Sequence, residues 1–593
     1  MRAAVVGVTA FAAVAAAGCT PRPEGPVPNA QVFVDAFAVQ DLGDAATATD
    51  RPNEARRAMA AAWEGLQGES MTATIGDAKI NGDTARVSYT YEWHLPKDRV
   101  WTYTGELQMG RRDGVWGVRW TSSDIHPQLG DTQTMALRST AAPRARVNER
   151  SGSDVLVPGV VQRISFDPRK AADPVGEARR LADALDKFDP TIKAQSIVES
   201  STAANGAYHV ATLQQDHYEQ VQALLSVLPG VVVGDEADLV TTDRDFAPDV
   251  ISQIKKTVID EVDGKAGWSV VTVNSNGADT DVLTETSPQP VPSFSVTLDR
   301  PIQDAAQRAV DARAEQTMMV VIQPSTGAIL AVAQNAAADR DGPVATTGLY
   351  PPGSTFKIIT AGAAIQSGLA TPHTSVPCPG RIEIGERSIP NYDGFSLGTV
   401  PMATAFARSC NTSFAKLASE LAPDGLHLAA AELGIGQDYS VVGVPTESGS
   451  VPPADDLVQR TEDGFGQGKV LVSPFGMALA AATVAHGSAP VPNLLAGHET
   501  TIEGERPPIT PEMVDGLRSM MRLVVTSGTA TRISGEGEIH GKTGEAEVDG
   551  GSHAWFVGYR GDLAFATLVV KGGSSDNAVA VTKDMFDMLP VEY

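Results

Sequence analysis

A serine and a lysine stand at the head of an apolar run, and this pairing constrains the fold more than any other feature. Residues 356–365 are dominated by aromatic, branched and small side chains, which is typical of a buried helix. Two prolines and a glycine at 351–353 break any structure before it. Ser354 is therefore predicted at the N-terminus of a buried helix, with Lys357 one turn later on the same face.

A buried lysine beside a serine has a definite chemical use. Burial and a second nearby cation both disfavour the ammonium form, so that the amine becomes a base near neutral pH. The free N–H groups at a helix N-terminus favour an oxyanion forming at Ser354. We expect Lys542 to be the second cation, if the fold brings its strand alongside Lys357.

A second polar triplet, Ser409-Cys410-Asn411, lies between two segments that are expected to be helical, 402–408 and 412–421. In an extended turn, residues i and i+2 point the same way. Ser409 and Asn411 are therefore expected to face one cleft together.

The third motif, Lys542-Thr543-Gly544, is predicted to lie on a strand. Gly544 has no Cβ, so a substrate backbone can approach the strand closely. The N–H of Glu545 is then expected to supply an oxyanion donor beside the N–H of Ser354.

Each motif is weak when taken alone. Ser-x-x-Lys also occurs at Ser252/Lys255 and at Ser413/Lys416, and Ser-x-Asn recurs at residues 575–577. A lone match of this kind usually marks solvated surface. Only the copies described above have the apolar helix, the connection and the strand in the right order.

Together and in this order, the three motifs resemble those of the penicillin-binding proteins and class A β-lactamases. Residues 296–593 resemble the transpeptidase domain of a class B penicillin-binding protein, with further marks at 296–300, 466–468 and 473–478. The resemblance implies a multidomain α+β protein, whose C-terminal β-lactamase/transpeptidase-like domain has a helical subdomain inserted in a five-stranded antiparallel sheet. Besides the Lys542 strand, we expect strands at 317–323, 328–333, 553–559 and 563–570.

The same resemblance implies a peptidoglycan D,D-transpeptidase that crosslinks stem peptides through a serine acyl-enzyme and is acylated by penicillins. No cofactor and no metal are expected. The implied catalytic residues are Ser354 as nucleophile, Lys357 as base, Ser409 as proton donor to the departing D-alanine, Asn411 and Lys542. The implied substrate-binding residues are Thr543, Gly544 and Glu545.

Glu545 departs from the family pattern, in which a hydroxyl residue usually follows Lys-Thr-Gly. A carboxylate there would repel the substrate's own carboxylate unless it points away. Three other functions stay open: a D,D-carboxypeptidase, a slow β-lactamase on the same site, and a non-catalytic cell-division scaffold. The β-lactamase is disfavoured because no Glu-x-x-x-Asn pattern occurs between Asn411 and Lys542.

Composition and the N-terminus indicate where the chain acts. The formal charge of −26 argues against binding to nucleic acid or to an anionic membrane surface. Residues 1–18 resemble a signal peptide ending in a lipobox, with Cys19 as the lipid anchor and a Pro-rich tether over 19–28. Ordinary signal cleavage, or retention as an uncleaved anchor, is the alternative. We therefore expect a lipid-anchored protein on the extracytoplasmic face of the cell membrane.

The rest of the chain is expected to form three further parts. Residues 29–136 resemble the nuclear-transport-factor-like extension of some class B penicillin-binding proteins, a cone-shaped α+β module that we interpret as a spacer. Residues 137–283 resemble the pedestal or dimerisation domain, and 284–295 form a linker. Expected partners are stem peptides, β-lactams as inhibitors, the membrane, a glycan polymerase and division-complex proteins.

Cys378 and Cys410 remain after the anchor cysteine. An exported protein can pair them, but two buried thiols are equally consistent with the sequence. Cys410 lies inside the second motif, and we interpret it as a packing residue and not as a nucleophile.

Overall fold

The backbone packs into two compact units. The computed structural model describes residues 25–204, 206–504, 506–591 and 593. Of these residues, the first unit comprises 25–143 together with 263–290, and the second comprises those within 144–262 and 291–593.

Two expectations at the N-terminus concern residues that are largely not described. The expected signal peptide and the anchor at Cys19 lie outside the described residues. Of the expected Pro-rich tether, Val27 and Pro28 already belong to the first helix.

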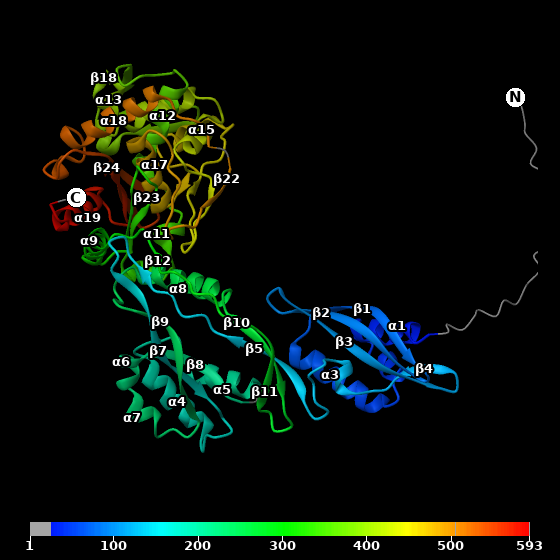
Figure 1. Ribbon diagram of the computed structural model, residues 1–593. Coiled ribbons are helices and arrows are strands. Elements are labelled where there is room, and N and C mark those ends of the chain that lie inside the picture. The colour runs from blue at the N-terminus through cyan, green and yellow to red at the C-terminus, as the bar shows by residue number, and fades with distance from the viewer. Residues whose placement is uncertain (1–24, 205, 505, 592) are drawn as a thin grey trace, which may run out of the picture. The chain divides into compact units, whose positions relative to one another are not determined.

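Three helices and a four-stranded antiparallel sheet form most of the first unit (Figure 1). The helices are α1 (Val27–Ala38), α2 (Leu42–Thr47) and α3 (Pro52–Leu66); the strands, paired in chain order, are β1 (Ser70–Asn81), β2 (Thr84–Leu95), β3 (Arg99–Arg112) and β4 (Val115–Val118). Side chains of β2 alternate between the core and the outer face, which buries Tyr89, Tyr91 and Trp93. The expected α+β module is therefore present.

A second, three-stranded sheet completes the first unit. Its strands are β5 (Thr134–Thr140), β10 (Gly267–Val273) and β11 (Asp279–Thr286), in the order β11-β10-β5. Val270 of β10 joins the same buried cluster as Trp93. Residues 263–283, which the sequence placed with the pedestal, therefore pack into the first unit, because β10 pairs with β5 along its whole length.

The N-terminal part of the second unit is a sheet flanked by helices. Its strands are β6 (Val147–Asn148), β7 (Asp154–Phe166), β8 (Tyr208–Gln214), β9 (Val231–Thr241) and β12 (Phe294–Ser295); its helices are α4 (Pro174–Leu185), α5 (Ala194–Ala203), α6 (Gln215–Glu219), α7 (Gln222–Leu225) and α8 (Pro248–Asp263). Strand β12 pairs in parallel with β6, so the segment expected to be a linker ends as part of this sheet.

The C-terminal part of the second unit contains the expected five-stranded antiparallel sheet. Its strands run in the order β14 (Ile329–Gln334), β13 (Thr317–Ile322), β25 (Leu563–Val569), β24 (Gly551–Arg560) and β23 (Ile539–Val548). Every residue of β13 is buried, so both faces of the sheet are covered. The covering helices are α9 (Arg300–Asp311), α17 (Pro474–His486) and α19 (Asp576–Met588).

A helical subdomain is inserted between β14 and β23. Its central helix is α12 (Lys357–Gln366), against which α14 (Asn411–Glu420), α15 (Gly425–Glu432) and α18 (Pro511–Thr526) pack. The remaining elements are α10 (Ala336–Asp339), α11 (Val344–Thr347), α13 (Met402–Ala407), α16 (Leu457–Asp463), β15 (Ser375–Cys378), β16 (Arg381–Ile384), β17 (Arg387–Pro390), β18 (Gly398–Pro401), β19 (Asp438–Ser440), β20 (Gly449–Ser450), β21 (Leu471–Val472) and β22 (Thr501–Glu503). The first eight residues of α12 are buried, which confirms the expected buried helix.

Candidate active site

Ser354 lies in a tight turn that precedes α12. The turn is a 3₁₀ helix over Gly353–Phe356, so the α-helix proper begins at Lys357 and not at the serine. Gly353 has φ 53°, and its N–H donates to the carbonyl of Gly466 at 3.0 Å. A Cβ at 353 would lie 2.3 Å from the carbonyl oxygen of Glu545, so only glycine lets the turn pack this closely on β23.

Lys357 is the hub of the site. Its Nζ lies 2.8 Å from Ser354 Oγ, 2.9 Å from the Ser409 carbonyl oxygen and 2.6 Å from Asn411 Oδ1. Asn411 Nδ2 donates to the carbonyl of Pro390 at 3.3 Å, which orients the amide with Oδ1 toward the lysine. A neutral amine has two N–H groups and one lone pair. The carbonyl and Oδ1 accept the two N–H groups, which leaves the lone pair for the hydroxyl of Ser354.

Lys542, which lies on β23, also contacts Ser409. Its Nζ donates to Ser409 Oγ at 2.9 Å and to the Thr543 carbonyl at 2.8 Å. Ser409 Oγ also lies 3.3 Å from Lys357 Nζ, so one hydroxyl links both lysines. Strand β23 therefore does lie alongside the serine and lysine at the start of α12.

Both lysines are fully buried, and burial lowers the pKa of each. Burial, followed by the charge of Lys542, holds the pKa of Lys357 well below its usual value. Burial lowers the pKa of Lys542 to about 7, with Glu545 acting against that shift. The rings of Phe406 and Phe414, both fully buried, lie 5.7 Å from Lys542 Nζ and 5.9 Å from Lys357 Nζ, respectively.

The second motif forms the connection between α13 and α14, but not as an extended turn. Ser409 has φ 59°, in the left-handed region that serine rarely adopts. Asn411 is already the first residue of α14. The expectation of an extended turn is therefore wrong at Ser409, although Ser409 and Asn411 both contact Lys357.

The third motif lies on β23, at the edge of the sheet. A Cβ on Gly544 would lie 2.8 Å from the carbonyl oxygen of Pro352, so the strand lies directly against the turn that carries Ser354. The Glu545 carbonyl faces this turn and Gln467, whose Nε2 donates to it at 3.4 Å. Within an antiparallel ladder, the N–H and C=O of one residue point to the same side. The N–H of Glu545 therefore faces the nucleophile turn as well.

The side chain of Glu545 is directed to the start of α19. Its Oε1 accepts the N–H of Ser575 at 2.8 Å, at the helix N-terminus, where a negative charge is favoured. The same carboxylate still lines the cleft and influences Lys542. The negative charge of Glu545 is thus partly compensated by the helix N-terminus, but it still lies at the cleft.

These groups open into a cleft of about 810 Å³. Its lining includes Ser354, Ser409, Asn411 and Thr543, whose hydroxyl hydrogen-bonds to that of Thr529. Residues 387–395, named here the cleft wall, line the same cleft. Nothing in the sequence distinguishes the wall or Thr529, because a short hairpin and a lone threonine carry no recognisable pattern.

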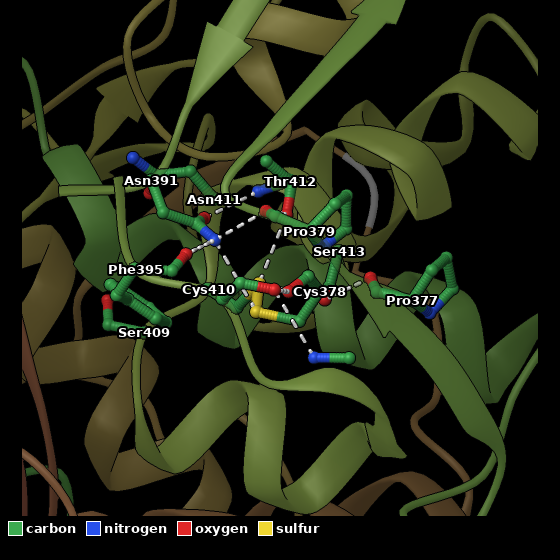
Figure 2. The surroundings of a disulfide bond; sticks show 12 residues. Pro377, Cys378, Pro379, Asn391, Phe395, Ser409, Cys410, Asn411, Thr412 and Ser413 are labelled. Atoms are coloured by element: carbon green, nitrogen blue, oxygen red, sulfur yellow. Dashed lines mark hydrogen bonds between the residues drawn. A yellow bond between two sulfur atoms is a disulfide. The ribbon is translucent and has the colours of Figure 1, made fainter. Parts of the chain in front are cut away.

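The two remaining cysteines form a disulfide beside the second motif (Figure 2). Cys378 and Cys410 are 6.2 Å apart at Cα and both are fully buried. The sequence left open whether they pair, and in this structure they do.

The other Ser-x-x-Lys copies do not form sites. Lys255 pairs with Asp238, and Lys416 pairs with Glu420 at 2.6 Å. Ser413 donates instead to the carbonyl of Pro377 at 2.7 Å. In neither copy do serine and lysine face each other, because each lysine is held by a carboxylate.

Two family models and several curated proteins are similar to parts of this chain. Residues 317–587 match the family model described as penicillin binding protein transpeptidase domain, and residues 25–133 match the NTF2-like N-terminal transpeptidase domain. The peptidoglycan D,D-transpeptidase PbpA of Mycolicibacterium smegmatis is 29% identical over 322 residues, which cover 46% of this chain and 65% of that protein. The penicillin-binding protein PbpB of the same organism is 32% identical over 279 residues, covering 42% and 43%.

A solved structure shares the fold. It is that of the penicillin-binding protein PBP2 in complex with MreC from Helicobacter pylori, with a TM-score of 0.59 and 17% identity over 77% of this chain and 98% of that one.

The chain spans less than two thirds of the length of the two curated relatives named above. Within the described ranges, the helices are too short or too polar to cross a bilayer.

Proposed function

This chain belongs to the class B penicillin-binding proteins, and we propose that it is a serine-type peptidoglycan D,D-transpeptidase that penicillins acylate. The observation that carries the proposal is the convergence of Ser354, Ser409 and Asn411 on the buried amine of Lys357. The name of its PbpA relative, peptidoglycan D,D-transpeptidase, supports the reaction class.

The proposed acylation step begins with proton transfer. The neutral amine of Lys357 takes the proton of Ser354, whose Oγ attacks the carbonyl of the penultimate D-alanine. The N–H groups of Ser354 and Glu545 hold the oxyanion. Ser409, which lies between the two lysines, then donates its proton to the amine of the departing D-alanine and takes up the proton that Lys357 received from Ser354.

The substrate carboxylate needs charge and direction. Lys542 supplies positive charge near it, and Thr543 supplies a hydroxyl that lines the cleft. Asn411, also on the cleft, orients the donor peptide. The amine of a second stem peptide resolves the acyl-enzyme and forms the crosslink, without a cofactor.

Location and domain roles belong to the same proposal. We place the active site on the extracytoplasmic face of the cell membrane, with a lipid on Cys19 as the anchor. Residues 29–136 act as a spacer and residues 137–283 include the pedestal, which positions the transpeptidase domain of 296–593. The candidate protein partners are a glycan polymerase and division-complex proteins.

A labelled penicillin tests the proposal. We expect a stable mass increase on the purified protein that is lost on Ser354→Ala. Ser252→Ala and Ser413→Ala are the matched controls, because each removes the serine of a Ser-x-x-Lys pattern that forms no site; both keep the adduct. Rapid release of hydrolysed drug would indicate a β-lactamase, and no adduct on any variant would leave a non-catalytic scaffold.

A further inference from the structure

The disulfide joins the second motif to the segment that leads into the cleft wall. Cys378 ends β15, and the hairpin that follows it carries the cleft wall at 387–395. Cys410 stands between Ser409 and Asn411, the two residues of the second motif that contact Lys357. One covalent bond therefore ties the wall-bearing segment to the motif.

A buried asparagine reinforces this connection (Figure 2). Asn391 of the cleft wall is 2% exposed, and its Oδ1 accepts the N–H of Thr412 at 3.1 Å. Its Nδ2 donates to the carbonyls of Pro379 at 2.8 Å and Phe395 at 2.9 Å. The wall and the start of α14 are thus held together as one piece.

Ser409 needs such support because its backbone is strained. A serine at φ 59° persists only where the surrounding structure holds it there. Glycine would relieve the strain but would remove the hydroxyl that bonds to Lys542 at 2.9 Å. The disulfide is attached at the adjacent residue, Cys410, so it acts directly on the strained position.

We propose that the Cys378–Cys410 disulfide is a positioning element for acyl transfer, which holds Ser409 and Asn411 on Lys357 and fixes the cleft wall beside them. The kinetic consequence of this role rests on the proposed function, whereas its structural consequence does not depend on that function. Without the disulfide, the strained connection relaxes and water reaches Lys357. Because burial is the main cause of the lowered pKa of Lys357, that pKa then rises toward its usual value.

The test compares the double variant Cys378→Ala/Cys410→Ala with Leu417→Ala. Leu417 is buried and does not line the cleft, and it lies on α14, the helix that follows Cys410. Thermal melts first establish that both variants are folded at the assay temperature. Alkylation of the denatured, unreduced wild type must leave both cysteines unmodified; labelling of both overturns the proposal at once.

Hydrogen–deuterium exchange gives the structural readout, which does not depend on any activity. We expect the amides of residues 405–413 to exchange faster in the double variant than in Leu417→Ala. Equal protection in the two variants overturns the proposal, even if the wild type proves unable to react with penicillin.

Penicillin acylation gives the kinetic readout. In the double variant, we expect the limiting acylation rate to fall ten- to a hundredfold with little change in the drug concentration giving half that rate. We also expect the acid limb of its pH profile to move to higher pH. If the double variant has the same acylation rate and pH profile as Leu417→Ala, the disulfide only stabilises the fold, and its positioning role is overturned. Absence of any wild-type adduct would refute the proposed function alone.

Discussion

Replacing Gly544 with alanine separates the nucleophile turn from β23. The added Cβ would lie 2.8 Å from the Pro352 carbonyl oxygen, 2.8 Å from Thr355 Cγ2 and 3.0 Å from Thr355 N. Two of these atoms belong to the backbone and cannot rotate away, so the strand or the turn must shift by several tenths of an ångström. Overpacking of this kind costs about 1–3 kcal/mol of stability.

The shift has a larger effect on chemistry than on stability. It moves the N–H of Glu545 away from that of Ser354, and loss of one oxyanion donor costs about 10²–10³ in rate, or about 2.7–4 kcal/mol. We therefore predict that Gly544→Ala lowers the rate of acylation by a labelled penicillin on the order of a hundredfold. The assay is a time course at several drug concentrations, beside a thermal melt.

Gly541 on the same strand provides the control. A Cβ there would lie 2.7 Å from Phe556 Cε2 and 3.2 Å from the Val557 carbonyl oxygen, so it is equally crowded but has no contact with the nucleophile turn. Gly541→Ala should lose similar stability and keep most of its acylation rate. If the two variants acylate within a few-fold of each other, the close approach of β23 to the turn does not form the oxyanion site.

Three further predictions concern the charges and backbone of the site. Between about pH 7 and 10.5 the unfolded chain binds more protons at Lys542 than the folded chain does, so wild-type stability rises with pH in this range. The unfolding free energy of Lys542→Met minus that of the wild type should therefore decrease from pH 7 to 9.5 in urea unfolding, and a value that stays constant or increases would contradict the lowered pKa of Lys542. Since Glu545 raises the pKa of Lys542, Glu545→Gln should shift the alkaline loss of penicillin binding to lower pH, whereas a shift to higher pH would refute that coupling. A Cβ at position 353 would lie 2.3 Å from the Glu545 carbonyl oxygen, on a residue whose φ is 53°. Gly353→Ala should therefore remove the penicillin adduct in mass spectra while the sheet remains folded. A normal adduct would show that the turn tolerates displacement.

The sequence was sufficient for the parts of the site that local chemistry determines. The apolar run after Lys357 requires a buried helix, and the strand carrying Lys542 follows from its place in the family pattern. The order of the motifs along the chain also distinguished Ser354 from Ser252 and Ser413, the serines of the other two Ser-x-x-Lys copies. These features depend on neighbouring residues or on the motif set as a whole.

Other features depend on contacts between distant segments. Spacing alone does not decide whether Cys378 and Cys410 pair, and nothing next to Ser409 indicates its left-handed backbone. The direction of Glu545 depends on Ser575, which follows it by thirty positions. Likewise, nothing in the sequence of β10 specifies β5 as its partner.

The central claim, acyl transfer to an amine, is tested most directly by the fate of the acyl group. The wild type and Ser354→Ala are given a synthetic stem-peptide thioester with a D-amino acid as acceptor, and the products are identified by mass spectrometry. We predict the aminolysis product with the wild type and none with Ser354→Ala. Hydrolysed acid alone, or equal turnover by the two proteins, would contradict a transpeptidase acting through Ser354.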